Sequence, residues 1–193
     1  MERYVWYACY GSNLLRERFM CYVQGGLIPG NDKVERGAKD PTPPIDDKPL
    51  RIEHTLFFSM SMTKWNGSGV AFLDWRRDDE ACTLGRMYLI TEDQFFDVVR
   101  QENGLGPGAP VSIDKDALAR EGSQVIFPDK PYGRLLYLGE EEGHPIYSFT
   151  CVAPAEEMGR APLFGGYRDV IAAGLAQTYR MDNEAIDAYL AES

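Results

Sequence analysis

The amino-acid sequence predicts an α/β domain of the α+β kind, with helices around a core of strands. Three observations lead to this prediction. A β-type run at residues 4–9 passes straight into a helix, strands dominate residues 52–90, and amphipathic helical segments lie at 92–101 and 164–175. The 193 residues, 44% of them hydrophobic, suffice for one sizeable core and are few for two. We therefore expect a single domain over residues 1–193.

The first element is a strand that ends in a glycine loop. Aromatic and β-branched residues fill positions 4–9, and Gly11, Ser12 and Asn13 interrupt the run before helix-type residues begin at Leu14. A strand, a loop and a helix start in this order aim several backbone N–H groups at one place, where the helix dipole also favours negative charge. An anionic or carbonyl oxygen could bind there. A turn that only redirects the chain is the commoner meaning of such a short glycine motif.

The stretch from 25 to 49 follows the first helix. It contains five prolines among Gly, Asp and Lys residues, namely Pro29, Pro41, Pro43, Pro44 and Pro49. A segment of this composition buries few side chains and cannot extend a helix. We expect a long Pro/Gly-rich surface insertion here, too short to form a domain of its own.

Three strands are predicted in the middle of the chain, at 54–60, 69–74 and 82–90. The first two are separated by turn-type residues at 65–68, which favours a hairpin. Thr91 and Gln94 have the spacing of a capping box, which predicts a helix over 92–101. This helix ends at Glu102, next to Asn103.

The remaining elements are predicted from periodicity and turn signals. They are a short exposed helix at 114–121, two antiparallel strands at 135–138 and 146–152 around the polar turn 140–145, an amphipathic helix at 164–175, and a final helix that Asp182 caps and that runs through Ile186 and Tyr189. This order of strands and helices is compatible with several α+β arrangements.

The charge balance argues against polyanionic partners. The 30 acidic and 20 basic residues give a formal net charge of −10, which would repel a phosphate backbone or an anionic membrane surface. No apolar run approaches the roughly 20 residues that cross a bilayer, and the N-terminus lacks a signal-peptide pattern. We expect no nucleic-acid partner, no membrane association and a cytoplasmic location.

Metal-binding spacing is also absent from the sequence. The cysteines and histidines are scattered along the chain, at Cys9, Cys21, His54, Cys82, His144 and Cys151. Cys9 and Cys151 lie within apolar runs, where a buried inert thiol is the usual case. The spacing thus predicts no metal site.

The glycine loop resembles the signature loop of the gamma-glutamylcyclotransferase family. The matching run is Tyr10-Gly11-Ser12-Asn13-Leu14, followed by Leu15-Arg16-Glu17-Arg18. Three further stretches resemble the family in the same order, namely 65–71, the strand with Gly85 and Tyr88 before the helix that ends in Glu102, and the helix from Pro162 through Tyr167 to Gly174 and Leu175. Two departures stand out. Asn103 separates Glu102 from Gly104, and one extra glycine precedes Tyr167.

The resemblance implies a small mixed β-barrel with surrounding helices and a cavity at one end. It also implies an enzyme that cyclises a γ-glutamyl amide or peptide to 5-oxoproline and releases the amine, as in glutathione metabolism. In that interpretation Glu102 is the general acid/base, and the reaction needs no metal, nucleotide or other cofactor. The substrate-binding residues would be Tyr10, Gly11, Ser12, Asn13, Leu14 and Tyr167. The sequence does not identify the amine, and the oligomeric state is open.

Two other classes of function stay open at this point. A non-catalytic binding module of the same fold is one, and the departure at Asn103 keeps it open. A cysteine or serine hydrolase is the other, using Ser12, or Cys9 with His54 or His144. Without the resemblance, Glu102 would be an ordinary exposed residue at a helix end.

Overall fold

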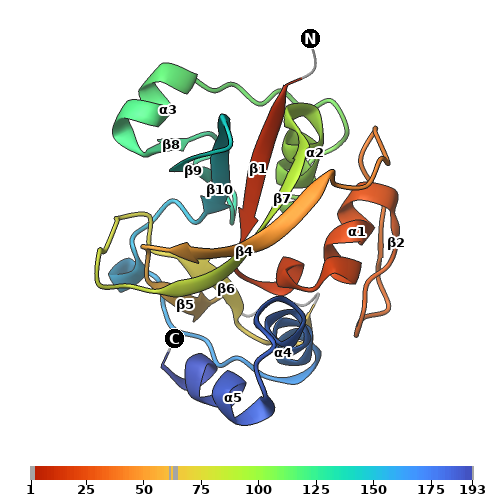
Figure 1. Cartoon of the computed structure of the whole chain (residues 1–193), viewed down its shortest axis with the longest axis vertical. Helices are drawn as coiled ribbons and strands as arrows, with labels where there is room; N and C mark the ends of the chain where they lie inside the picture. Colours follow the sequence, from red (N-terminus) through yellow and green to blue (C-terminus); the bar gives the residue numbers. More distant parts are fainter. Residues whose placement is uncertain (1–2, 61, 63–64, 193) are drawn as a thin grey trace.

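A six-stranded mixed sheet forms the centre of the computed structural model, which describes residues 3–60, 62 and 65–192 (Figure 1). The strands follow the order β4-β7-β1-β10-β9-β8. Their bounds are β1 (Tyr4–Cys9), β4 (Asp46–Ile52), β7 (Thr83–Thr91), β8 (Ser123–Val125), β9 (Arg134–Glu141) and β10 (His144–Thr150). The neighbours β1 and β10 run parallel and the other neighbours antiparallel.

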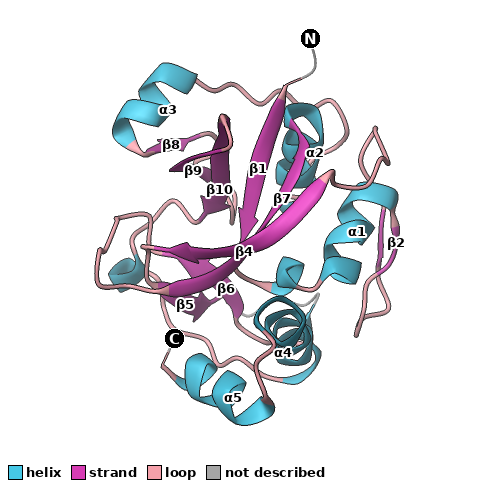
Figure 2. Ribbon diagram, in the orientation of Figure 1, coloured by secondary structure: helices cyan, strands magenta, loops and turns pink. Residues whose placement is uncertain are grey.

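Helices surround this sheet, which confirms the predicted α/β class (Figure 2). They are η1 (Ser12–Leu14), α1 (Arg16–Gln24), α2 (Glu92–Glu102), α3 (Lys115–Glu121), η3 (Ala155–Glu157), α4 (Gly165–Tyr179) and α5 (Asn183–Ala191). The capping box is present as predicted, since Thr91 Oγ1 accepts from Gln94 N and Gln94 Oε1 accepts from Thr91 N. No helix in the described part of the chain is long and apolar enough to span a membrane.

The core fixes α2 against β1. Val5 to Cys9 are almost fully buried because β7 and β10 flank β1 on both edges. Phe95 of α2 lies between three rings, with centroid distances of 5.8 Å to Tyr7, 5.7 Å to Tyr147 and 6.3 Å to Phe149. Such aromatic packing holds the helix in one orientation. The end of α2 is thereby directed to the end of β1.

The predicted β-barrel is not found in the described residues. The sheet is open, with β4 and β8 as its edges, and the predicted hairpin of β5 (Leu56–Ser59) and β6 (Val70–Leu73) forms a separate two-stranded sheet. The fold-class prediction was therefore right in its mixture of helices and strands, and wrong in its closed barrel.

Side chains explain why β6 joins no third strand. The Ala71 N–H donates to the Tyr167 hydroxyl at 3.0 Å, and Thr150 Oγ1 bonds both the N–H of Leu73 (3.0 Å) and its carbonyl oxygen (2.7 Å). These backbone groups would otherwise pair with a neighbouring strand. The outer edge of β6 is thus bonded to side chains of β10 and α4.

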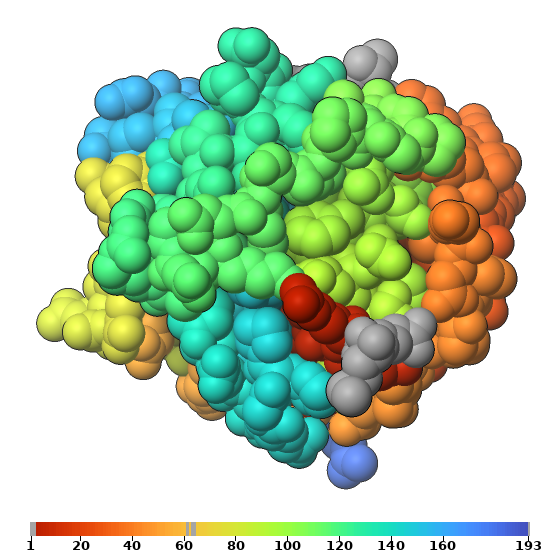
Figure 3. Space-filling model, turned by 90° about the horizontal axis from the view of Figure 1, so that it is seen from above, coloured from red at the N-terminus to blue at the C-terminus, as the bar shows by residue number. Residues whose placement is uncertain are grey.

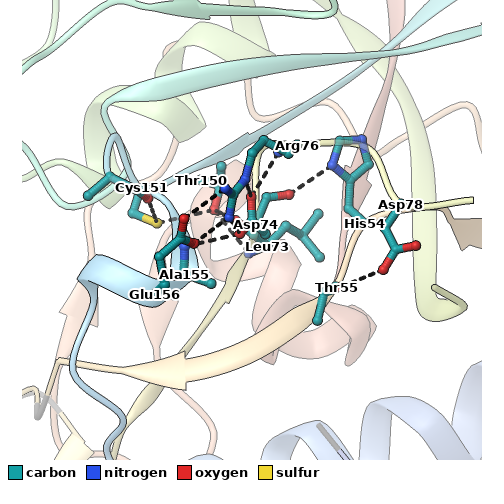
Figure 4. A network of polar contacts seen from close by, with 11 residues as sticks. His54, Thr55, Leu73, Asp74, Arg76, Asp78, Thr150, Cys151, Ala155 and Glu156 are labelled. Atoms are coloured by element: carbon teal, nitrogen blue, oxygen red, sulfur yellow. Dashed lines mark hydrogen bonds and ion pairs between the residues drawn. The ribbon is translucent and has the colours of Figure 1, made fainter. Parts of the chain in front are cut away.

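Asp74, just beyond β6, anchors the hairpin to the segment after β10 (Figure 4). Its carboxylate accepts from Arg76 Nη2 at 2.7 Å and from Ala155 N at 3.1 Å, and Glu156 also binds Arg76. Burial opposes ionisation of Asp74, but the bonds from Arg76 and Ala155 outweigh it and lower the pKa of this carboxyl from 3.8 to about 2. Asp74 is therefore ionised in the folded protein at neutral pH.

We expect Asp74→Asn to lower the free energy of unfolding at pH 7 by about 2 kcal/mol, the value of the pKa difference. Because the folded-state pKa is depressed, this stability is present above pH 4 and is lost as the pH falls toward 2. Urea unfolding should show the difference from wild type shrinking by more than half at about pH 2.5. Asp78→Asn, which replaces an exposed carboxylate nearby, serves as the control. An equal loss in both variants would contradict the prediction.

Parts of the segment 25–49 form strands, where the sequence predicted a loop throughout. It contains the hairpin of β2 (Gly26–Leu27) and β3 (Val34–Glu35), and its end is the first part of β4, paired along β7. Pro49 is tolerated because only one edge of β4 is paired. In Figure 3 this segment (orange) adjoins α2 (yellow-green), where Gln94 Nε2 donates to the carbonyl oxygens of Asp40 and Thr42.

Candidate active site

A small cavity lies where β1 ends and the chain enters η1. Its volume is about 30 Å³. The residues that line it are Tyr7, Cys9, Tyr10, Gly11, Ser12, Asn13, Glu102, Tyr132, Phe149 and Tyr167. The structure thus places the predicted acid/base Glu102 in one cavity with Tyr10 to Asn13 and Tyr167. Leu14 lies outside this lining.

The carbonyl groups of the loop are bonded on the side of β7. The Tyr88 hydroxyl donates to the Asn13 carbonyl oxygen at 2.9 Å, and Arg86 Nη1 donates to that of Leu14 at 3.2 Å. Asp47 of β4 binds Arg86 in turn, with 2.9 Å between Nε and Oδ1. Three strand residues therefore fix the orientation of the peptide groups in η1.

Two of the loop amides have no acceptor in the described residues. The Leu14 N–H donates to the Gly11 carbonyl oxygen at 3.0 Å, so it is used inside the loop. The Ser12 backbone bonds the Tyr167 hydroxyl. No bond from the N–H groups of Gly11 or Asn13 is found within the described part of the chain. These two amides are the donors that the loop offers to a ligand.

Glu102 is half-buried at the end of α2 and faces the loop. Asn13 Nδ2 donates to its Oε1 at 3.3 Å, although the two residues are 89 positions apart in the sequence. The Tyr22 hydroxyl is a second hydrogen-bond partner. The guanidinium of Arg18 lies close enough to interact with Glu102 electrostatically. The carboxylate is thus held beside the loop by groups from η1 and α1.

Four phenols converge on the cavity, from Tyr7, Tyr10, Tyr132 and Tyr167. Burial raises the pKa of each hydroxyl, so all four are neutral at physiological pH. The Tyr10 hydroxyl donates to the Phe149 carbonyl oxygen at 2.7 Å. The Tyr167 hydroxyl instead accepts from Ala71 N, which leaves its proton for another acceptor. The site therefore offers neutral donors beside one carboxylate.

Arg18 was not among the predicted site residues. Its side chain is almost completely buried, Nη2 binds Glu35 of β3 at 3.0 Å, and its guanidinium lies 4.1 Å from the ring centroid of Tyr22. Its Nε and Nη1 have no partner in the described residues. The spacing of Arg18 and Tyr22 could have predicted their contact, since residues four apart share one helix face.

Asn103, the departure from the family pattern, is a buried structural residue. Its Oδ1 accepts from the Tyr132 N–H and its Nδ2 donates to the Tyr132 carbonyl oxygen, both at 3.0 Å. Nδ2 also donates to Val99 O at 2.9 Å. The extra residue after Glu102 therefore joins the end of α2 to the segment that carries Tyr132.

A cysteine hydrolase finds little support in this geometry. The Cys9 thiol donates to the Arg86 carbonyl oxygen, and burial raises its pKa, so a thiolate is disfavoured. His144 packs against Tyr4 at the opposite end of β1, roughly 16 Å away at the rise of a strand. His54 bonds the Asp74 carbonyl oxygen and lines a different cavity. Among the described residues, no three His, Cys, Asp or Glu side chains are grouped to hold a metal ion.

Comparisons with known proteins give one sequence relative and several similar structures. No protein-family model matches the chain. Over 198 aligned positions it is 34% identical to "Histone deacetylase 5" of Arabidopsis thaliana, a match that covers 96% of this chain and 30% of that protein. This chain therefore spans about 30% of the length of that protein.

Three solved structures are similar at 15–16% identity. An uncharacterized human protein, loc79017, has a TM-score of 0.53, with 97% of this chain and 86% of that chain covered. A structure named gamma-glutamyl cyclotransferase has a TM-score of 0.49, with coverage of 99% and 100%. A yeast gamma-glutamyl cyclotransferase specific to glutathione has a TM-score of 0.41, with coverage of 98% and 95%. This chain shares the fold of the human protein.

Proposed function

We propose that this protein is a gamma-glutamylcyclotransferase. It converts a γ-glutamyl amide or peptide into 5-oxoproline and the free amine, with Glu102 as general acid/base. The proposal rests on the resemblance of the glycine loop and on the cavity in which this loop meets Glu102. The Arabidopsis protein named as a histone deacetylase is more than three times as long as this chain, so its name assigns no activity to the aligned part.

One observation carries the proposal, namely the contact between Asn13 Nδ2 and Glu102 Oε1 at 3.3 Å. The resemblance alone assigns a binding role to the loop and a catalytic role to the glutamate, and does not say how far apart the two segments lie. The two assignments are chemically useful only if the two segments meet. In the structure they line the same cavity.

The reaction needs positioning and proton transfer. The α-amine of the substrate attacks the γ-carbonyl carbon of the same molecule, so a bound and folded substrate supplies both reacting groups. Glu102 takes a proton from the amine and returns it to the leaving nitrogen as the C–N bond breaks. The Gly11 and Asn13 amides, with the Tyr167 hydroxyl, stabilise the negative charge that develops on the carbonyl oxygen.

A panel of γ-glutamyl compounds tests the proposal. It should include glutathione, a γ-glutamyl amino acid and a γ-glutamylamine, each scored for release of 5-oxoproline. We expect turnover of at least one member. Binding of γ-glutamyl compounds without release of 5-oxoproline would instead favour the non-catalytic module. If the protein neither binds these compounds nor releases 5-oxoproline from them, the proposal is overturned.

We expect the activity to survive dialysis against EDTA. The proposed steps use only backbone amides, the Tyr167 hydroxyl and the Glu102 carboxylate, and Cys9 and Glu102 are the only cysteine, histidine or acidic residues among the described residues that line the cavity. The measurement is 5-oxoproline release before and after chelation, with added zinc as a further arm. Activity that disappears with EDTA and returns with zinc would contradict this mechanism.

A further inference from the structure

The cavity beside Glu102 is smaller than any γ-glutamyl compound. Its 30 Å³ has room for about one water molecule, whereas pockets for small molecules span roughly 300–1,000 Å³. A substrate that reaches Glu102 therefore has to displace one wall of the cavity. The identity of that wall decides which substrates enter.

Tyr132 is the wall that regular structure restrains least. The other lining residues lie on β1, η1, α2, β10 or α4, or in the two-residue link between β1 and η1. Tyr132 lies in the turn-rich link 126–133 between β8 and β9. Within the described part of the chain, its hydroxyl makes only a long bond, to the Ala71 carbonyl oxygen at 3.4 Å. Displacing this side chain breaks no strand or helix.

The position of Tyr132 depends on Asn103. The paired hydrogen bonds between the Asn103 amide and the Tyr132 backbone hold the link against the end of α2. The ring then stacks on Phe72 at 4.9 Å and meets Phe149 edge-on at 5.6 Å. This side of the cavity is aromatic. The polar groups that a γ-glutamyl head requires lie on the loop, Glu102 and Tyr167.

We propose that Tyr132, positioned by Asn103, determines the substrate specificity of this site. It admits γ-glutamyl amides of small amines and excludes those of bulky aromatic amines. The inference rests on the proposed function, because the γ-glutamyl head occupies the polar side and leaves the aromatic side to the amine.

Substrate preference tests this specificity. We compare kcat/KM for γ-glutamyl methylamide and γ-glutamyl p-nitroanilide. Tyr132→Ala should raise the anilide-to-methylamide ratio at least about tenfold, a normal scale for enlarging an apolar pocket. Asn103→Ala should raise it less, and Tyr132→Phe should keep it because the ring remains. Tyr137→Ala, on β9 and outside the cavity lining, is the matched control. An unchanged ratio in Tyr132→Ala overturns the inference.

Thiol modification provides a readout that does not depend on activity. Cys9 lines the cavity and is only 2% exposed. In a Cys82→Ser background, which removes the exposed thiol, we expect Tyr132→Ala to speed modification of Cys9 by methyl methanethiosulfonate at least about tenfold. Mass spectrometry of the Cys9 peptide measures the rate, and Tyr137→Ala should leave it unchanged.

The two readouts separate the possible failures. If wild type releases no 5-oxoproline from either amide or from any other γ-glutamyl compound of the panel, the proposed function falls and the specificity falls with it. If it releases 5-oxoproline from other panel members but from neither amide, this inference alone falls. If 5-oxoproline is released but the Cys9 rate is the same in Tyr132→Ala and wild type, Tyr132 is not the wall and this inference alone falls. Circular dichroism checks that each variant folds. If Tyr132→Ala does not fold, both readouts are measured on Asn103→Ala instead.

Discussion

Replacing Glu102 by glutamine is expected to lower 5-oxoproline release at least about a hundredfold, the usual effect of removing a general base. The amide has the shape of the carboxylate and keeps an oxygen that can accept the bond from Asn13 Nδ2, which is 3.3 Å from Oε1 in the wild type. It cannot take a proton from the substrate amine. The fold should therefore persist while turnover is lost, with kcat falling much more than substrate affinity.

Asp97→Asn is the matched control for this variant. It makes the same carboxylate-to-amide change on the same helix, at a residue that binds Arg100 and the Lys39 N–H and does not line the cavity. Circular dichroism and thermal unfolding should be the same for the Glu102 variant and wild type. Near-normal activity of Glu102→Gln would remove the assignment.

Elements with strong local signals were predicted from the sequence. The apolar run of β1, the capping box of Thr91 and Gln94, and the Asp182 cap of α5 each depend on neighbouring residues, and each is found in the structure. Such signals act within one turn of helix or along one strand. The elements that they indicate can therefore be predicted without knowing the rest of the fold.

Elements that depend on a distant partner were missed or misassigned. β4 carries Asp, Lys and Pro, which disfavour strands, and it forms because β7 offers it an edge and Arg86 binds Asp47. Closure of a barrel fails because Thr150 and Tyr167 bond the outer edge of β6. No local pattern in the sequence reports these contacts.

The candidate site likewise contains residues that were predicted before the structure and residues whose role depends on distant contacts. Tyr10 to Asn13 and Glu102 were named through a family resemblance, since no periodicity relates residues 89 positions apart. The role of Asn103 became visible only with its bonds to Tyr132, which lies in a link that sequence signals left unassigned. The departure from the family pattern beside Glu102 is a hydrogen-bonded contact between two segments.

Gly11→Val should reduce kcat/KM at least about a hundredfold, the scale found when a donor to the developing oxyanion is lost. A Cβ at position 11 would lie 2.9 Å from the Tyr167 hydroxyl oxygen and 3.1 Å from the Ala71 Cβ. A valine side chain would displace the Tyr167 hydroxyl, which accepts from Ala71 N, and would fill the space that a substrate oxygen needs. Binding of 5-oxoproline, measured by calorimetry, should be lost together with turnover.

Two further variants show whether this effect comes from the space beside Gly11. Ser12→Ala removes a hydroxyl but keeps the backbone N–H, so we expect a much smaller loss. Gly106→Val adds the same side chain at a glycine where, apart from its chain neighbours, no atom of the described residues lies within 4 Å of the new Cβ, so activity should be unchanged. If Gly11→Val binds 5-oxoproline as tightly as Gly106→Val does, the loop is not the binding element. The contact between Asn13 and Glu102 would then be structural, because no ligand group would depend on the loop.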